Sequence, residues 1–323
     1  MRQSWERDRA ELALDAAALA RLLDPAFPGA MIASVEPVPG GLINTNLKIR
    51  LRDRPAPVLL RVYQRDAEEG LKEVALMRRF ATRVPVPEVL HDARTNPVTG
   101  HAYSILGWVD GVDLEALVLA GGDLRAAGRM LGTALARVHA EKFERFGYLG
   151  ADLKLTKPID LDRDGLLFYL NHMFAAGPGA ARLGAELMSA LVAFVEREGH
   201  LVTTWPGAPC LAHGDCNGSN LLFRQDAHRS WQLTAMLDWE FACSGTPGID
   251  FGQLLRPPFV RQPTLADAAA AAYQDAGGLL PPDWRAVARI TDLFAWTDII
   301  SRPDAGPSVI ADARSFIAAI VNL

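Results

Sequence analysis

The sequence LAHGDCNGSNLLF, residues 211–223, places a polar loop between two short apolar stretches. The apolar stretches are expected to be buried strands, so both ends of the loop are fixed. Asp215 and Asn220 stand five residues apart in this loop. Phosphoryl transfer requires a carboxylate that takes the proton of the acceptor hydroxyl and a nearby amide oxygen that binds Mg²⁺. The stretch is therefore interpreted as a catalytic loop, with a solvated turn rich in Gly, Asn and Asp as the alternative.

A second stretch of the same form follows further along the chain. In AMLDWEF, residues 235–241, an apolar strand ends at Asp238. Mg²⁺ in nucleotide sites prefers few carboxylates together with phosphate oxygens. One aspartate at a strand end, close to Asn220, is enough to hold a metal–nucleotide pair. The two stretches therefore support each other.

Together these two stretches resemble the catalytic and metal loops of the aminoglycoside phosphotransferase and choline kinase-like superfamily, which is related to the protein kinases. The resemblance rests on HGD at 213–215 with Asn220, followed by DWE at 238–240, and it covers residues 30 to 255. It implies an α+β, bilobal protein-kinase-like fold. A small N-terminal lobe with an antiparallel sheet, residues 1–107, would bind the nucleotide, and a larger, mainly helical C-terminal lobe, residues 108–323, would carry the two loops and the acceptor pocket.

The same resemblance implies a role for each site residue. Asp215 would be the catalytic base, Asn220 and Asp238 would hold Mg²⁺, and ATP or GTP would be the phosphoryl donor. Nucleotide binding would fall to Gly40, Gly41, Asn44, Arg61, Glu73, Leu106 and Trp108. Glu240 would line the acceptor pocket or close a salt bridge, and His213 and Asp250 would brace the loops.

Three of these assignments also have a physical basis, and two of them have an alternative. Backbone N–H groups around Gly40 and Gly41 can approach phosphates closely because glycine has no side chain. Arg61 stands where kinases place a lysine; an arginine is always charged and grips phosphate in two places, but an ordinary surface arginine is the alternative. Trp108 would form a pocket wall or pack in the core.

Charge and composition limit the partners and the compartment. The net charge of −5 argues against nucleic-acid binding by phosphate neutralisation. Residues 1–110 carry a net charge of +1 and the remainder −6, which would suit an aminated sugar or another cationic alcohol without excluding a neutral acceptor. No apolar run is long enough for a membrane span or a signal peptide, and three cysteines do not make a disulfide framework. We therefore expect a cytoplasmic protein with no membrane partner.

The pattern of apolar residues predicts the elements of both lobes. Helices are expected at 11–23, 67–82, 123–142, 166–176, 185–198, 265–275, 283–300 and 308–320. Strands are expected at 32–38, 45–51, 58–63, 88–93, 103–106, 210–212, 221–223 and 233–237.

Three other functions compete with an aminoglycoside-like kinase. A metabolite kinase of the choline, homoserine or sugar type would use the same loops on a different acceptor. A nucleotide-binding pseudokinase would keep the fold without turnover, although such proteins often lose the base or a metal ligand. A scaffolding protein would leave the arrangement of Asp215, Asn220 and Asp238 unexplained.

Overall fold

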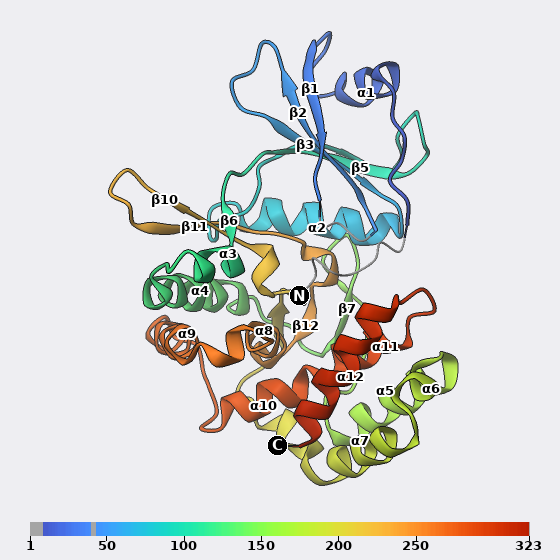
Figure 1. Ribbon diagram of the computed structural model, residues 1–323, viewed down its shortest axis with the longest axis vertical. Coiled ribbons are helices and arrows are strands. Elements are labelled where there is room, and N and C mark those ends of the chain that lie inside the picture. Colours follow the sequence, from blue (N-terminus) through green and yellow to red (C-terminus); the bar gives the residue numbers. More distant parts are fainter. Residues whose placement is uncertain (1–8, 40–42, 323) are drawn as a thin grey trace.

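The N-terminal lobe is built on a five-stranded antiparallel sheet (Figure 1). The structure is a computed structural model that describes residues 9–39 and 43–322. The sheet order is β1 (Ile32–Pro37), β2 (Thr45–Leu51), β3 (Val58–Tyr63), β5 (Ala102–Gly107) and β4 (Val89–Ala93), and the helices of this lobe are α1 (Ala16–Leu23) and α2 (Ala67–Phe80).

Buried and less buried side chains alternate along β2, which shows that one face of this sheet packs in the core. Along β2 the side chains of Thr45, Leu47, Ile49 and Leu51 are buried while those between them are not, as the two-residue period of a strand requires. Three leucines of α1 complete the core on this face. The predicted start of α1 at residue 11 is wrong: the Asp15 side chain accepts a hydrogen bond from Ala18 N and caps the helix, so helical structure begins at Ala16.

The C-terminal lobe is mainly helical. Its helices are α3 (Leu114–Leu119), α4 (Leu124–His139), α5 (Arg163–Ala176), α6 (Gly179–Leu183), α7 (Ala185–Glu198), α8 (Pro247–Leu254), α9 (Pro263–Asp275), α10 (Trp284–Thr291), α11 (Leu293–Ser301) and α12 (Pro307–Val321). Helices α4 and α9 pack with their backbones close together, since a Cβ on Gly132 would come within 2.0 Å of Ala269 O. The predicted fold class, α+β with a small antiparallel sheet and a larger helical lobe, is confirmed.

The prediction of one helix over 283–300 is wrong. The chain forms α10 and α11, which are separated at Asp292. This buried carboxylate accepts hydrogen bonds from Arg256 Nε and Nη2, at 2.8 and 2.6 Å, and from Trp296 Nε1, at 2.7 Å. The sequence has no Pro or Gly at this break, and the contact with Arg256, 36 residues away, gives no local signal.

Two small sheets hold the loops of the C-terminal lobe. One has the order β11 (Trp231–Met236), β10 (Leu221–Gln225) and β6 (Val112–Asp113), and the other the order β8 (Leu155–Pro158), β7 (Gly147–Leu149), β12 (Cys243–Gly245) and β9 (Cys210–Ala212). The predicted catalytic loop joins β9 to β10 through the 3-10 helix η3 (Gly218–Asn220), and η4 (Trp239–Phe241) follows β11. In the part of the chain that the structure describes, no helix has the length and hydropathy needed to cross a bilayer.

Candidate active site

Asp250, on α8, anchors the predicted catalytic loop by hydrogen bonds to its backbone. Its fully buried carboxylate accepts hydrogen bonds from His213 N at 2.8 Å and Gly214 N at 2.9 Å, and it contacts His139 Nε2 at 2.9 Å. Burial disfavours the charge, but the bonds from His139 and the loop outweigh it and keep the pKa of Asp250 below its ordinary value. The loop is thus held by charge-assisted hydrogen bonds to a fixed anion. Sequence reasoning missed His139, because one histidine on an amphipathic helix gives no local signal.

His213 braces the loop from within. Its ring is buried against Trp239 with 4.3 Å between ring centroids, and its Nδ1 accepts a hydrogen bond from Asp215 N at 3.2 Å. Burial lowers the pKa of His213 below its ordinary value, although the neighbouring Asp250 and Asp215 oppose this. A neutral, packed imidazole suits a bracing role.

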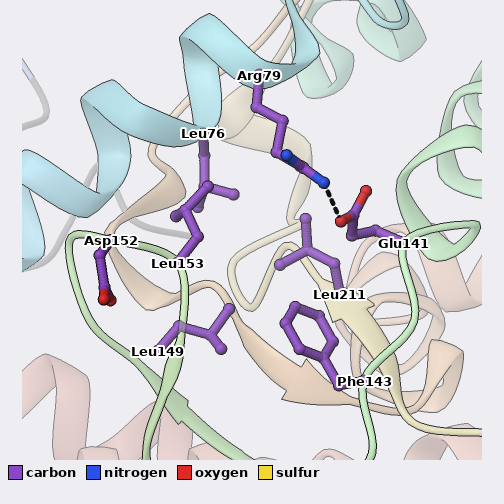
Figure 2. A pocket seen from close by; sticks show the side chains of 8 residues that line it. All are labelled: Leu76, Arg79, Glu141, Phe143, Leu149, Asp152, Leu153 and Leu211. Atoms are coloured by element: carbon purple, nitrogen blue, oxygen red, sulfur yellow. Dashed lines mark hydrogen bonds and ion pairs between the residues drawn. The ribbon is translucent and has the colours of Figure 1, made fainter.

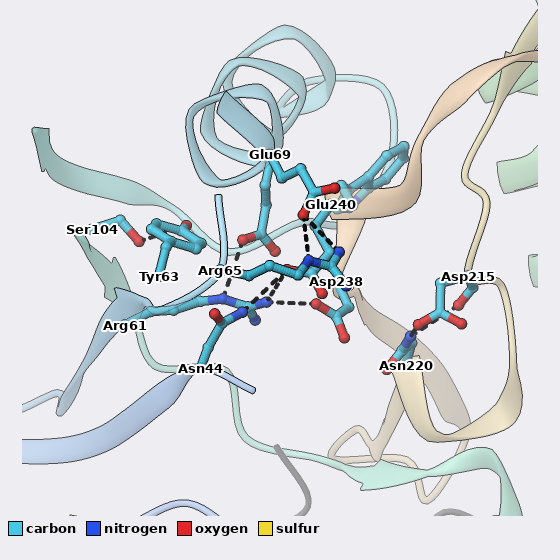
Figure 3. Close-up of polar contacts among 12 residues, drawn as sticks. Asn44, Arg61, Tyr63, Arg65, Glu69, Ser104, Asp215, Asn220, Asp238 and Glu240 are labelled. Carbon is cyan, nitrogen blue, oxygen red and sulfur yellow. Dashed lines mark hydrogen bonds and ion pairs between the residues drawn. The ribbon is translucent and has the colours of Figure 1, made fainter. Parts of the chain in front are cut away.

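The carboxylate of Asp215 is buried and is held by two side-chain amides, of which that of Asn220 is labelled in Figure 3. Asn217 Nδ2 donates to its Oδ1 at 2.7 Å, and Asn220 Nδ2 donates to its Oδ2 at 2.8 Å and to its backbone oxygen at 2.9 Å. The amide nitrogen of Asn220 therefore faces Asp215, which leaves its amide oxygen directed elsewhere. Sequence reasoning missed Asn217, although an Asn two residues after the Asp could have suggested it.

Gly214 lets η4 pack directly against this loop. Its φ is +78°, and a Cβ at this position would come within 2.1 Å of Phe241 O. Only glycine combines a left-handed backbone with so close an approach. The chain next to Asp215 is thereby fixed to the backbone of Phe241.

Asp238 and Asn220 lie at neighbouring strand ends. Leu237 N donates to Asn220 O at 2.8 Å, and Leu221 pairs with Met236. Asp238 has φ 68° and ψ 62°, a left-handed conformation that is costly for a residue other than glycine and is found where a site requires it. Among the described residues no group of three His, Cys, Asp or Glu side chains could hold a metal. One carboxylate and one amide oxygen nevertheless fit Mg²⁺, which commonly takes its other ligands from phosphates and water.

Arg61, on β3, is surrounded by three carboxylates (Figure 3). Its Nε lies 3.2 Å from Glu73 Oε2, and its Nη2 lies 2.6 Å from Asp238 Oδ1 and 3.5 Å from Glu240 Oε2. Burial disfavours its charge, but the three acids outweigh burial and raise its pKa well above the ordinary value. Arg61 is therefore a largely buried cation that joins the sheet, α2 and η4, and it is not an ordinary surface arginine.

Glu240 lies between Arg61 and Asn44. Asn44 Nδ2 donates to Glu240 Oε2 at 3.1 Å, so the segment before β2 is tied to the C-terminal lobe. Burial and the nearby Asp238 carboxylate raise the pKa of Glu240 to about 7, against the opposing charge of Arg61. This carboxyl group therefore changes its protonation close to neutral pH. Its predicted place in the acceptor pocket stays a prediction.

The other predicted nucleotide contacts lie apart from this cluster or outside the structure. Gly40 and Gly41 lie outside the described residues. Leu106 is buried in the core at the end of β5. The Trp108 ring lies 4.2 Å from Lys48 Nζ, and its Nε1 donates to Asp110 Oδ1 at 2.8 Å.

A cavity of about 150 Å³ lies under α2 (Figure 2). It is bounded by leucines of α2, β7 and β9 and by the ion pair between Arg79 and Glu141. No predicted site residue lines it. We therefore assign the candidate active site to the place where Asp215, Asn220 and Asp238 converge, and not to this cavity.

Comparison with known proteins gives a consistent result. The profile described as "Phosphotransferase enzyme family" matches residues 34–290. A thermostable mutant of aminoglycoside phosphotransferase APH(4)-Ia, in a ternary complex with ADP and hygromycin B, has a TM-score of 0.68 and 20% identity and covers 94% of this chain and 98% of its own. The GDP complex of wild-type aminoglycoside 2'-phosphotransferase-IIIa has a TM-score of 0.70 and 18% identity over 95% and 99%. A related GDP and kanamycin complex has a TM-score of 0.65 and 18% identity over 86% and 88%. No curated protein matches the sequence significantly.

Proposed function

Because this chain belongs to the phosphotransferase enzyme family, we propose that it transfers the γ-phosphoryl group of ATP or GTP to a hydroxyl group of a small molecule. One observation carries the proposal: the buried Asp215 carboxylate is held by two amides beside the strand ends that bear Asn220 and Asp238. The nucleotides bound in similar structures support ATP or GTP as the donor.

Asp215 acts as the catalytic base. The amides of Asn217 and Asn220 occupy one lone pair on each carboxylate oxygen and fix the plane of the group, while an ionised carboxylate has further acceptor sites for a substrate hydroxyl. Asp215 orients that hydroxyl and takes its proton late, because the transition state of phosphoryl transfer is loose. Its main contribution is therefore alignment of the acceptor.

Two other groups act on the donor phosphates. Asn220 and Asp238 would hold Mg²⁺, which when bound neutralises charge that develops on the phosphate oxygens. Arg61 supplies a permanent positive charge beside Asp238, where it would attract the donor phosphates. Glu73 keeps this side chain in place through its contact with Nε.

The acceptor is a small hydroxyl-bearing molecule. Hygromycin B and kanamycin in similar structures support an aminoglycoside-like acceptor. A metabolite alcohol of the choline, homoserine or sugar type would use the same base and the same metal ligands.

The test is ADP or GDP formation by the purified protein with Mg²⁺ and an acceptor panel. Asp215→Asn should lower kcat by roughly 10²- to 10⁴-fold, the usual contribution of a general base, while the thermal shift produced by Mg·ATP or Mg·GTP persists. Asp267→Asn is the matched control, because the Asp267 side chain is 65% exposed on α9. Undiminished turnover in Asp215→Asn would refute the assignment of the base.

A further inference from the structure

Buried hydrogen bonds connect the segment before α1 to the candidate active site. Residues 10–12, which we call the N-terminal strap, have no regular secondary structure, and their backbone bonds to two side chains of the sheet lobe. Leu12 N donates to Thr45 Oγ1 at 2.9 Å. Gln64 Nε2 donates to Ala10 O at 3.0 Å. The two side chains are also joined to each other, since Thr45 Oγ1 donates to Gln64 Oε1 at 2.6 Å.

The same two residues hold Asn44. Thr45 is its neighbour in the chain, and the backbone N–H of Gln64 donates to Asn44 Oδ1 at 3.2 Å. Because this bond engages the amide oxygen, the amide nitrogen of Asn44 is left to face another acceptor. It donates to Glu240 Oε2 at 3.1 Å. The hydrogen bonds thus lead from the N-terminal strap to a carboxylate of the other lobe.

The four side chains that make this connection are buried. Asn44, Thr45, Gln64 and Glu240 are each at most 8% exposed. In the part of the chain that the structure describes, the buried side-chain nitrogen and oxygen atoms of Asn44, Thr45 and Gln64 all have a hydrogen-bond partner. A satisfied polar network is rigid, and removing one member leaves its partners buried and unpaired. Loss of the Thr45 hydroxyl would therefore disturb the strap and Gln64 together.

At the site, Glu240 Oε2 is shared between Asn44 and Arg61 (Figure 3). Arg61 Nη2 lies 3.5 Å from this oxygen but only 2.6 Å from Asp238 Oδ1. The hydrogen bond from Asn44 supplies Glu240 with a second donor, so the guanidinium stays close to Asp238. Without that bond, Glu240 would draw the guanidinium toward itself. Asn44 therefore helps to set where the positive charge of Arg61 lies.

We propose that Thr45 and Gln64 are positioning residues for the nucleotide donor. Through them the N-terminal strap fixes Asn44, which in turn holds Glu240 and keeps Arg61 at its place beside Asp238. This inference rests on the proposed phosphoryl transfer, in which Arg61 attracts the donor phosphates. Because both residues act through Asn44, the effect of changing them is on donor binding.

The experiment measures the Kd of Mg·ATP and of Mg·GTP by titration of the purified protein. Thr45→Val removes the hydroxyl and keeps the shape of the side chain. We expect it to raise the Kd of the nucleotide that the wild type binds by about tenfold, within the usual range of coupling between two sites. Thr45→Ser keeps the hydroxyl and should bind nearly as the wild type does. Thr203→Val is the matched control and should leave the Kd unchanged, because Thr203 is exposed on the 3-10 helix η2 (Gly199–Thr204).

A double-mutant cycle tests the route through Asn44. Asn44→Ala alone should raise the Kd by about tenfold. Adding Thr45→Val to Asn44→Ala should raise it little further, since changes within one network do not add. A combined effect of about a hundredfold would show that Thr45 acts independently of Asn44, and would overturn the proposal.

Urea unfolding of each variant separates positioning from stability alone. A Thr45→Val protein that unfolds more easily but binds nucleotide as the wild type does would overturn the proposal. If Thr45→Val folds poorly, Gln64→Glu makes the same test, because it keeps the oxygen that accepts from Thr45 and loses the amide that donates to Ala10 O. It should raise the Kd, and an unchanged Kd would count against the proposal.

Failure of this inference can be distinguished from failure of the proposed function. Nucleotide binding by the wild type that responds to neither Thr45→Val nor Gln64→Glu would refute the inference and leave phosphoryl transfer intact. A wild-type protein that binds neither Mg·ATP nor Mg·GTP would refute the proposed function and the inference together.

Discussion

Replacing Glu240 by glutamine should stabilise the protein at alkaline pH and change little near pH 5. Burial and Asp238 raise the pKa of Glu240 from its ordinary value of 4.5 to about 7. A raised pKa means that the folded state binds this proton more tightly than the unfolded state, so the free energy of unfolding falls as pH rises through this window. At 1.36 kcal/mol for each unit of pKa, the charged form costs roughly 3 kcal/mol.

The glutamine variant avoids this cost. Its amide oxygen can still accept the hydrogen bond that Asn44 Nδ2 now donates to Glu240, but it carries no charge to bury. The difference in unfolding free energy between variant and wild type should therefore grow by roughly 3 kcal/mol between about pH 5 and pH 8. His213, whose lowered pKa acts in the opposite direction, is present in both proteins and cancels from this difference.

Urea unfolding at about pH 5, 6, 7 and 8, followed by tryptophan fluorescence, gives the required free energies. Glu68→Gln is the control for loss of an exposed carboxylate, since the Glu68 side chain is 49% exposed on α2. If Glu240→Gln and wild type lost stability in parallel as pH rose, Glu240 would be ionised at low pH and the electrostatic reasoning would be refuted.

Three further substitutions test the frame of the site. Gly214→Ala should lower the free energy of unfolding by about 2–4 kcal/mol in urea titrations and reduce kcat, because its Cβ would clash with Phe241 O. The control is Gly29→Ala, also at positive φ but with no atom within 4 Å of the added Cβ, which should cost about 1 kcal/mol. Equal costs for the two variants would argue against the clash. Asp250→Asn should cost about 3 kcal/mol by thermal or urea unfolding, since an amide cannot replace the buried anion; an unchanged midpoint would contradict the anchoring role. Arg61→Lys should weaken nucleotide binding by about tenfold in a titration, roughly 1.4 kcal/mol. One ammonium cannot keep the contacts with both Glu73 and Asp238, so the positive charge would lose its fixed position. Unaltered binding would show that the charge alone suffices.

Elements with a clear apolar period could be predicted from the sequence. The strands Thr45–Leu51 and Val58–Tyr63 and the helix Ala185–Glu198 have the predicted bounds. The three-residue strand Cys210–Ala212 also has them, because an apolar run before the polar catalytic loop marks it. Strands of two or three residues, such as β6 and β12, are too short to show any period. They are defined by pairing with distant segments, which a local pattern does not contain.

The contacts of the candidate site also divide into local ones, which the sequence indicates, and distant ones, which it does not. The loop residues Asp215 and Asn220 are close in the chain, so their hydrogen bond follows from a local turn that the sequence indicates. Arg61 and Asp238 are 177 residues apart, and His139 and Asp250 are 111 apart. Such contacts depend on how the lobes fold together, and with no comparison of related sequences the identity of each partner could not be deduced.

The left-handed backbone at Asp238 creates a conflict between catalytic activity and the stability of the fold at this one position. Asparagine there would relieve part of a conformational cost of about 1 kcal/mol and would keep an oxygen that accepts from Arg61, whereas glycine would relieve all of it but remove that contact. Variants selected for heat resistance alone should therefore accumulate Asn at position 238, whereas selection for turnover should retain Asp. In a mutational library, the residue found at position 238 would therefore show whether a surviving clone had been selected for stability or for turnover.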